Sequence, residues 1–235
     1  MYKRSVGIVL LLACCIFSVS CATRGNGIIS STDFSLQDFA SVEVFGSAEI
    51  RIYYAKTQSV RLTTDENLKE FVILEVNNDV LMVSSERGKK IRFTKYLVEI
   101  YTDDLESISC HGSSNVQVFD KINGFQTLSV AGSATIQFNE SVVLGNLDGK
   151  ISGSGKITAK GKCNNLNISI AGSGKFLGAE LEAENADVKV SGSGTATVFA
   201  VKILNANIGG SGKIFYKGNP TVNEHIGGSG MIKRI

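Results

Sequence analysis

The sequence predicts an all-β fold, a parallel β-helix-like solenoid with about 20 residues per coil and Gly-Ser-Gly corners. Three observations predict it. A Gly-Ser pair recurs along the chain, apolar and polar residues alternate on both sides of it, and 25 glycines accompany a single proline. Disordered sequence is usually rich in both residues, so this composition favours a packed repeat protein.

The Gly-Ser pair occurs eight times. The copies are Gly46-Ser47, Gly112-Ser113, Gly132-Ser133, Gly153-Ser154, Gly172-Ser173, Gly192-Ser193, Gly210-Ser211 and Gly228-Ser229. The first gap is 66 residues and the others are 20, 21, 19, 20, 18 and 18. The last five copies add a second glycine, at Gly155, Gly174, Gly194, Gly212 and Gly230. We interpret these triplets as structural turns, because glycine tolerates positive φ and close backbone approach.

The flanks of the pair repeat as well. Three positions before the serine stand Val44, Cys110, Val130, Ile151, Ile170, Val190, Ile208 and Ile226. Three positions after it stand Ile50, Val116, Ile136, Ile157, Phe176, Ala196, Ile214 and Ile232. Two positions after it most residues are polar, including Lys156, Lys175 and Lys213. This period of two indicates strands with one buried face, and stacking the coils about 4.8 Å apart would bury that face continuously.

Each coil is expected to hold two short strands and a second turn. Asparagine suits that turn, because it tolerates left-handed backbone angles. Asn146, Asn165 and Asn185 stand eight positions before the serine; Asn205 and Asn223 stand six before it, as expected if the two 18-residue coils had lost two residues. The 66-residue gap holds strand-like runs with charged or Asn-rich turns, which predicts the same solenoid with looser corners, acting as an N-terminal cap.

The N-terminus is predicted to be a lipoprotein signal peptide, residues 1–20. Lys3 and Arg4 precede an apolar stretch over Val6–Val19, which is short for a membrane-spanning helix. Small residues before Cys21 indicate lipidation there, although Cys14 follows a closer match to the lipobox and an ordinary cleaved signal is a third reading. Acyl chains on Cys21 would anchor an exported protein. Ala22, and not an aspartate, follows Cys21, and by resemblance to the enterobacterial sorting rule this implies the outer membrane.

The domain organisation follows. Residues 21–33 are expected to form a flexible tether and residues 34–235 a single β-solenoid domain, less regular over 34–110 and regular over 111–235. Cys110 and Cys163 are the cysteines of this body, and their register argues against a disulfide. Without Lys3 and Arg4, 22 basic and 22 acidic side chains give a net charge of 0, so nothing favours nucleic-acid binding.

The lipoprotein-type N-terminus, the strand-rich part after it and the serial corners together resemble the domain-of-unknown-function family described as "putative auto-transporter adhesin, head GIN domain". The resemblance covers roughly Phe34 to Ile235 and depends most on the corners at Ser154, Ser173, Ser193, Ser211 and Ser229. It implies a right-handed β-helix, similar in architecture to pectin lyases, with a role in adhesion and no agreed catalytic residues.

Pectin-lyase-like architecture raises the hypothesis of a polysaccharide lyase or hydrolase. Its candidate residues are the acidic cluster Asp103, Asp104 and Glu106, and the alternating Glu180, Glu182 and Glu184, which could also bind Ca²⁺ weakly. His111 and His225 fall several coils apart, and Cys110 takes the position of a buried aliphatic residue. We predict no catalytic residue, cofactor or metal site, since solvated turns and stripes explain these residues better.

The favoured function is therefore a non-catalytic cell-envelope lipoprotein that presents its β-surface for adhesion or for binding a glycan or a protein. Self-association is a further expectation. One surface stripe that could serve binding or self-association is the column of Lys156, Lys175 and Lys213, with Thr135 and Thr195 in register. The alternative remains a carbohydrate-active enzyme.

Overall fold

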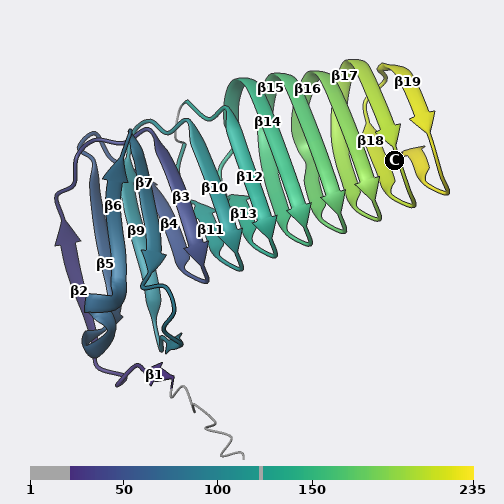
Figure 1. The fold of residues 1–235 in the computed structure, drawn as a ribbon. Helices are drawn as coiled ribbons and strands as arrows, with labels where there is room; N and C mark the ends of the chain where they lie inside the picture. The colour runs from purple at the N-terminus through teal and green to yellow at the C-terminus, as the bar shows by residue number, and fades with distance from the viewer. Residues whose placement is uncertain (1–21, 122–123) are drawn as a thin grey trace, which may run out of the picture.

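The computed structural model describes residues 22–121 and 124–235, so the predicted signal peptide and Cys21 lie outside the described residues. The described chain is a long β-solenoid with a broader N-terminal end (Figure 1). Its repeating part is built from β10 (Ser107–Gly112), β11 (Asn115–Val118), β12 (Thr127–Gly132), β13 (Thr135–Phe138), β14 (Val142–Gly153), β15 (Lys156–Gly172), β16 (Lys175–Gly192), β17 (Thr195–Ile208), β18 (Lys213–Lys217), β19 (Thr221–Ile226) and β20 (Met231–Arg234). We call residues 107–234 the regular coils.

The regular coils stack in parallel, and their register is the one that the Gly-Ser alignment predicts. Gly112 pairs with Gly132, Gly132 with Gly153, and Gly153 with Gly172. The aliphatic columns on both sides of the corner stay in register up to the last coil and are buried as far as Ile208 and Ile214. The prediction of an all-β solenoid with coils of about 20 residues is therefore confirmed, whereas its right-handed sense stays a prediction.

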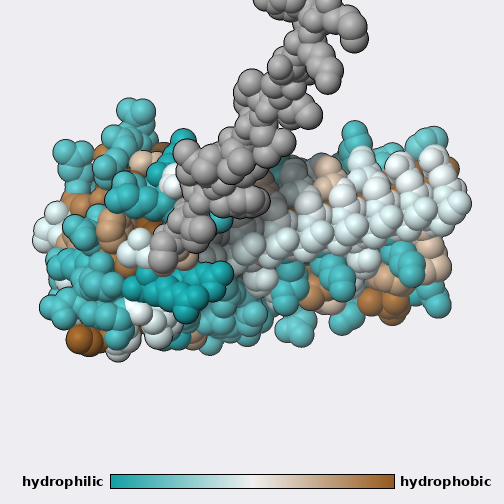
Figure 2. All heavy atoms as spheres, turned by 60° about the horizontal axis from the view of Figure 1, so that its bottom comes forward, coloured by the Kyte–Doolittle hydropathy of each residue, from teal (hydrophilic) through white to brown (hydrophobic). Residues whose placement is uncertain are grey.

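The Gly-Ser-Gly residues lie where one strand ends and the next begins, close to the backbone of the coil before. Gly172 has φ +118°, and a Cβ there would lie 2.6 Å from the carbonyl oxygen of Gly153 in the coil before. The serines are exposed, and Ser173 joins the coils through its backbone N–H, which donates to that same oxygen at 2.8 Å. Figure 2 shows these small residues as a pale band along the regular coils. Glycine is thus required by backbone proximity, and the serine hydroxyl takes no part in the coil-to-coil bonding seen here.

The second bend differs from the expected asparagine turn. β15 and β16 each run through it as one continuous strand, with Gly161 at φ +126° and a register shift between Thr158 and Lys160. Between β16 and β17 the register shifts twice, from Gly178 to Glu182 and from Ala183 to Asn185. The two residues that the shorter coils lack are therefore lost at this bend, ahead of the asparagines.

The long gap between the first two Gly-Ser pairs is an insertion between neighbouring coils. The first coil, made of β3 (Ser41–Gly46) and β4 (Glu49–Tyr54), pairs directly with β10 and β11, so that Gly46 lies beside Gly112. The intervening chain forms β5 (Ser59–Asp65), the 3₁₀ helix η1 (Glu66–Phe71), β6 (Val72–Asn77), β7 (Val80–Ser85), β8 (Ile91–Arg92) and β9 (Tyr96–Thr102).

This insertion is not a looser stretch of the same solenoid. β7 and β9 continue the stack in parallel with β3 and β4, but β5 pairs antiparallel with β9, and β6 antiparallel with β7. β6 and β7 are joined by the short turn Asn78-Asp79, and such a connection favours antiparallel pairing, because parallel neighbours need a longer crossover. We call residues 22–34 and 55–106 the cap; together they cover the N-terminal side of the first coil (Figure 1).

The predicted flexible tether, residues 21–33, contains two strands. β1 (Thr23–Arg24) pairs with β8, and β2 (Ile29–Phe34) pairs antiparallel with β5. Between them, the buried carboxylate of Asp65 accepts the backbone N–H of Gly27 at 3.0 Å and of Thr94 at 2.7 Å. Burial opposes the ionisation of Asp65, but these backbone donors outweigh it and hold the pKa of the carboxyl below its usual value. The chain is docked here because it satisfies a buried charge.

Candidate functional site

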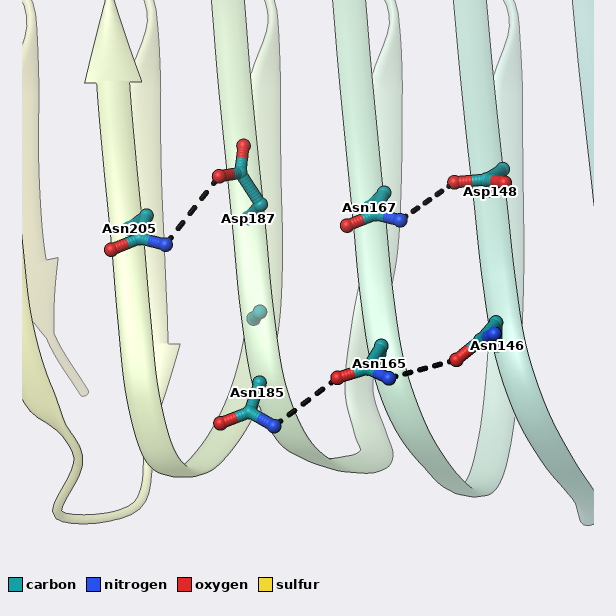
Figure 3. Close-up of a pocket in the computed structure, with 8 residues that line it drawn as sticks. Asn146, Asp148, Asn165, Asn167, Asn185, Asp187 and Asn205 are labelled. Carbon is teal, nitrogen blue, oxygen red and sulfur yellow. Dashed lines mark hydrogen bonds between the residues drawn. The ribbon is translucent and has the colours of Figure 1, made fainter.

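A shallow polar trough crosses four regular coils from β14 to β17 (Figure 3). It holds about 380 Å³ and is lined by Asn146, Asp148, Asn165, Asn167, Asn185, Ala186, Asp187 and Asn205. We call this feature the polar trough. Its polar side chains come from two positions of the coil, two residues apart on the same strand face, so they form two parallel columns; β17 contributes only Asn205.

The first column consists only of amides. Asn165 donates its Nδ2 to Oδ1 of Asn146 at 2.8 Å, and Asn185 donates to Oδ1 of Asn165 at 3.1 Å. The backbone register places these three residues side by side in successive coils. Each amide in such a ladder commits one N–H and one lone pair, which leaves a second N–H and a second lone pair for a ligand.

The second column alternates amides and carboxylates. Asn167 donates to Asp148 at 2.8 Å, and Asn205 donates to Asp187 at 3.5 Å. Asn223, one coil further on, donates to Asn205 at 2.9 Å. Neighbouring coils lie about 4.8 Å apart, where two carboxylates in register would repel each other. The intervening amides prevent this contact and satisfy the carboxylates by hydrogen bonding.

The charges beside the trough are balanced. Two residues beyond Asp148 stands Lys150, and two beyond Asp187 stands Lys189, both in the column that also holds Ser169. The coil between them has Asn167 and Ser169 at the same positions and carries no charge there. The surface therefore repeats every two coils, and each charged coil contributes one acid and one base.

Sequence reasoning found only part of this trough. It placed Asn205 and Asn223 in the column of Asn185, whereas Asn185 pairs with Ile203 and Asn205 pairs with Asp187. The asparagines also do not act through left-handed backbone angles. Among non-glycine residues of the described chain, positive φ occurs at Asn78 and Asp79, both in the cap. Asp148, Asn167 and Asp187 were missed as members of the site.

The acidic candidates from the sequence do not converge. Asp103 and Asp104 line a separate hollow of about 270 Å³ at the cap, together with Asp38, Lys56 and Gln58. Glu106 contributes its backbone carbonyl, which accepts from Gln126 at 2.9 Å.

The three alternating glutamates lie at the second bend. Glu182 pairs with Lys162 at 3.3 Å and Glu184 with Lys202 at 2.8 Å, while Glu180 lies in register with Lys160. Within residues 22–121 and 124–235 no group of three or more His, Cys, Asp and Glu side chains is arranged to hold a metal ion.

The histidines and cysteines are dispersed. His111 on β10 stacks on Phe45 and its Nε2 lies 2.9 Å from Glu43, whereas His225 lies on β19 near the other end. Cys110 is fully buried between Val44 and Val130, which confirms its expected place in an aliphatic column. Cys163 is also buried and free, and burial raises the pKa of each thiol to about 11.

The lysine column lies where the alignment predicts it, with Lys156 beside Lys175, Lys175 beside Thr195, and Thr195 beside Lys213. It belongs to the strand segment after the Gly-Ser-Gly residues, whereas the polar trough belongs to the segment before them.

In the part of the chain that the structure describes, no helix is long and apolar enough to cross a membrane.

Comparisons with known proteins agree with this architecture. The family described as "putative auto-transporter adhesin, head GIN domain" matches residues 38–220. No curated protein matches the chain. A "putative adhesin" from Bacteroides fragilis NCTC 9343 superposes with a TM-score of 0.86 at 21% identity, covering 91% of this chain and 100% of that one.

Two structures from Parabacteroides distasonis ATCC 8503 are also similar, and each alignment covers 92% of this chain and 100% of the other. One is described as a "putative lipid binding protein", with a TM-score of 0.73 and 24% identity. The other is described as a "putative adhesin", with a TM-score of 0.71 and 28% identity.

Proposed function

Because the chain belongs to the family of "putative auto-transporter adhesin, head GIN" domains, we propose that it is a non-catalytic cell-envelope lipoprotein that binds a glycan along the polar trough. The trough is the observation that carries this proposal. It offers a two-dimensional array of amide donors, amide acceptors and carboxylate acceptors, which are the groups that recognise sugar hydroxyls.

The charge pattern specifies the class of glycan. Asp148 and Asp187 are offset by Lys150 and Lys189, so the face favours a neutral chain over a strongly acidic one. The trough is open and runs across successive coils, so an extended polymer can lie along the solenoid axis and contact several coils at once. Contacts with many equivalent sites add through multivalency, which suits adhesion to a repetitive surface.

The non-catalytic assignment rests on how the carboxylates are used. Asp148 and Asp187 belong to alternate coils and each accepts a hydrogen bond from an asparagine. Most glycoside hydrolases use two carboxyl groups on either side of the bond that is cleaved, one of them held protonated by its environment. Both aspartates are instead solvent-accessible parts of a ladder.

Calorimetric titration of the mature protein with neutral and acidic polysaccharides tests this function. We expect binding to a neutral polysaccharide without release of shorter products. Asn167→Ala should weaken it about fivefold, as expected for one lost hydrogen bond. Lys175→Ala, at an exposed position outside the trough, is the matched control. Product release would refute the non-catalytic assignment, and unchanged affinity of Asn167→Ala would refute the trough as the binding site.

Anchoring is the second part of the proposal. Acylation of Cys21, with export to the outer membrane, is supported by the sequence around that residue. Cys21→Ala should release the protein from the membrane fraction and abolish the mass of the acyl groups, measured by fractionation and mass spectrometry. Cys14→Ala is the control. If that variant, and not Cys21→Ala, loses its membrane anchor, Cys14 is the lipidated residue.

A further inference from the structure

We propose that the exposed basic side chains of β1, β8 and the turn before β8 bind the headgroups of an anionic phospholipid bilayer. We call Arg24, Arg87, Lys90 and Arg92 the basic edge. All four are exposed, although the mature chain as a whole carries as many acidic as basic residues. This proposal depends on the lipid anchor proposed above in one respect only, since an acylated Cys21 would place this side of the protein against the bilayer.

The backbone brings these charges together. β1 pairs in parallel with β8, so that Arg24 lies directly beside Arg92. Thr23 donates its N–H to the carbonyl of Lys90 at 2.8 Å, and Gly25 donates to the carbonyl of Arg92 at 2.9 Å. Like charges in register on neighbouring strands destabilise a sheet, and a phosphate between the two guanidinium groups would remove that cost.

Nearby carboxylates do not neutralise the basic edge. Glu86 pairs with Lys89 at 2.9 Å, and Glu49 pairs with Lys95 and Arg51. No residue of the basic edge forms an ion pair within 4.0 Å among the described residues. Asp65 is buried and accepts backbone N–H groups instead. The charges of the basic edge are therefore available to an external anion.

The position of the basic edge indicates what that anion is. Only Ala22 separates Thr23 from Cys21, so acyl chains on Cys21 would hold β1 and β8 next to the lipid surface. Figure 1 shows β1 at the margin of the cap, away from the coils that carry the polar trough. A basic patch beside an acyl anchor is a usual combination of membrane signals, and each basic residue near an anionic surface adds to the attraction.

Sedimentation with lipid vesicles tests the proposal independently of the anchor. The mature chain, residues 21–235 with Cys21→Ser, should bind vesicles of phosphatidylethanolamine containing about one third phosphatidylglycerol and should not bind phosphatidylcholine vesicles. Roughly 0.5 M salt should abolish the binding, because exposed charges are then screened. Lys90→Glu/Arg92→Glu should weaken it about tenfold or more, given the contribution of each basic residue near an anionic surface.

The matched control is Lys156→Glu/Lys175→Glu, which reverses two lysines that lie beside each other on successive regular coils, away from the basic edge. It should keep the affinity of the parent for anionic vesicles. Lys90→Gln/Arg92→Gln serves as the milder variant, with the thermal unfolding midpoint as the check on folding. Equal binding to phosphatidylcholine, absence of binding to anionic vesicles, or an unchanged affinity of the folded Lys90/Arg92 variants would each overturn the proposal.

The outcomes separate this proposal from the function proposed above. A Lys90→Glu/Arg92→Glu chain that loses vesicle binding should keep its affinity for a neutral polysaccharide. Conversely, Asn167→Ala should leave vesicle binding unchanged, since Asn167 lies on β15 and not at the cap.

Discussion

The regular coils and the cap differ in what each strand has for a neighbour. A strand in the regular coils lies between two near-copies of itself, so one side chain repeats as a column of hydrogen bonds or of buried aliphatic groups. A strand in the cap has a unique neighbour, often antiparallel, and is held by single contacts such as those of Asp65. The coils therefore distribute each interaction over many repeats, whereas the cap concentrates it in a few residues.

The corner glycines allow the first test of this contrast, because the coil before Gly172 is a regular coil, whereas Gly46 lies in the first coil, next to the cap. Gly172 and Gly46 occupy the same corner position with positive φ, but a Cβ at Gly46 would meet nothing within 4 Å, whereas one at Gly172 would meet the backbone of the preceding coil. Gly46→Ala should cost about 1–2 kcal/mol of unfolding free energy, from the backbone conformation alone. Gly172→Ala should cost more than about 4 kcal/mol, because neither backbone can move without disturbing a strand pair.

Chemical denaturation of the two variants measures this difference. Gly209→Ala is the control for the added methyl group, since its Cβ meets nothing and its φ is not positive. Equal losses at Gly46 and Gly172 would mean that contact between coils does not limit the corner.

The buried carboxylate of the cap gives the next largest effect. Asp65→Ala leaves the N–H groups of Gly27 and Thr94 without their acceptor and should cost about 1–3 kcal/mol. Hydrogen exchange should accelerate at Gly25 and Gly27 and stay slow in β15. Asp33→Ala, which removes an exposed partner of Arg61, is the control and should change neither region measurably.

Acid should reproduce the Asp65 effect in the intact chain. The pKa of Asp65 is lower in the folded than in the unfolded chain, so the unfolded chain takes up its proton first as the pH falls. The stabilisation is complete at neutral pH and declines below about pH 4, toward the lowered pKa. Exchange at Gly27 measured from pH 7 to pH 3 should show this loss, and the Asp65→Asn chain should not.

The carboxylate spacing of the trough should give the smallest effect. Asn167→Asp would place carboxylates in three successive coils and should cost about 0.5–1 kcal/mol at pH 7. Acid removes the negative charges and with them the mutual repulsion, so the loss should be smaller at acidic pH. Asn165→Asp adds one charge between two amides and is the control. Thermal unfolding at pH 7 and pH 4 distinguishes the two.

The repeat made much of the regular part predictable. Eight Gly-Ser pairs fix the register, and the aliphatic residues three positions away on each side are the observed columns. The second column of the trough could have been predicted from the same alignment. Counting six residues back from each serine without a gap gives Asp148, Asn167, Asp187, Asn205 and Asn223, which is the observed second column. Sequence reasoning placed the two-residue deletion of the 18-residue coils after the asparagines, so the second column was not recognised.

The cap was less predictable because its pairing is not local. Strand runs in residues 55–106 are visible in the sequence, but nothing in them shows that Gly46 lies beside Gly112. The tether was read from composition, as Ala22 to Gly27 resemble a linker. Its docking depends on Asp65, a residue about 40 positions away, and on the backbone of Thr94. Such contacts have no periodic signal that a single sequence could reveal.

The insertion of the cap between two adjacent coils has a consequence for biosynthesis. The first coil is translated more than 50 residues before β10, its later neighbour, so it must find another partner in the meantime. Two strands of the cap, β7 and β9, provide one by pairing with β3 and β4 before β10 is made. We expect the cap and the first coil to fold together as a template, on which each later coil is then added in order of synthesis, since each coil contacts its two neighbours in the stack and only the earlier one has been made.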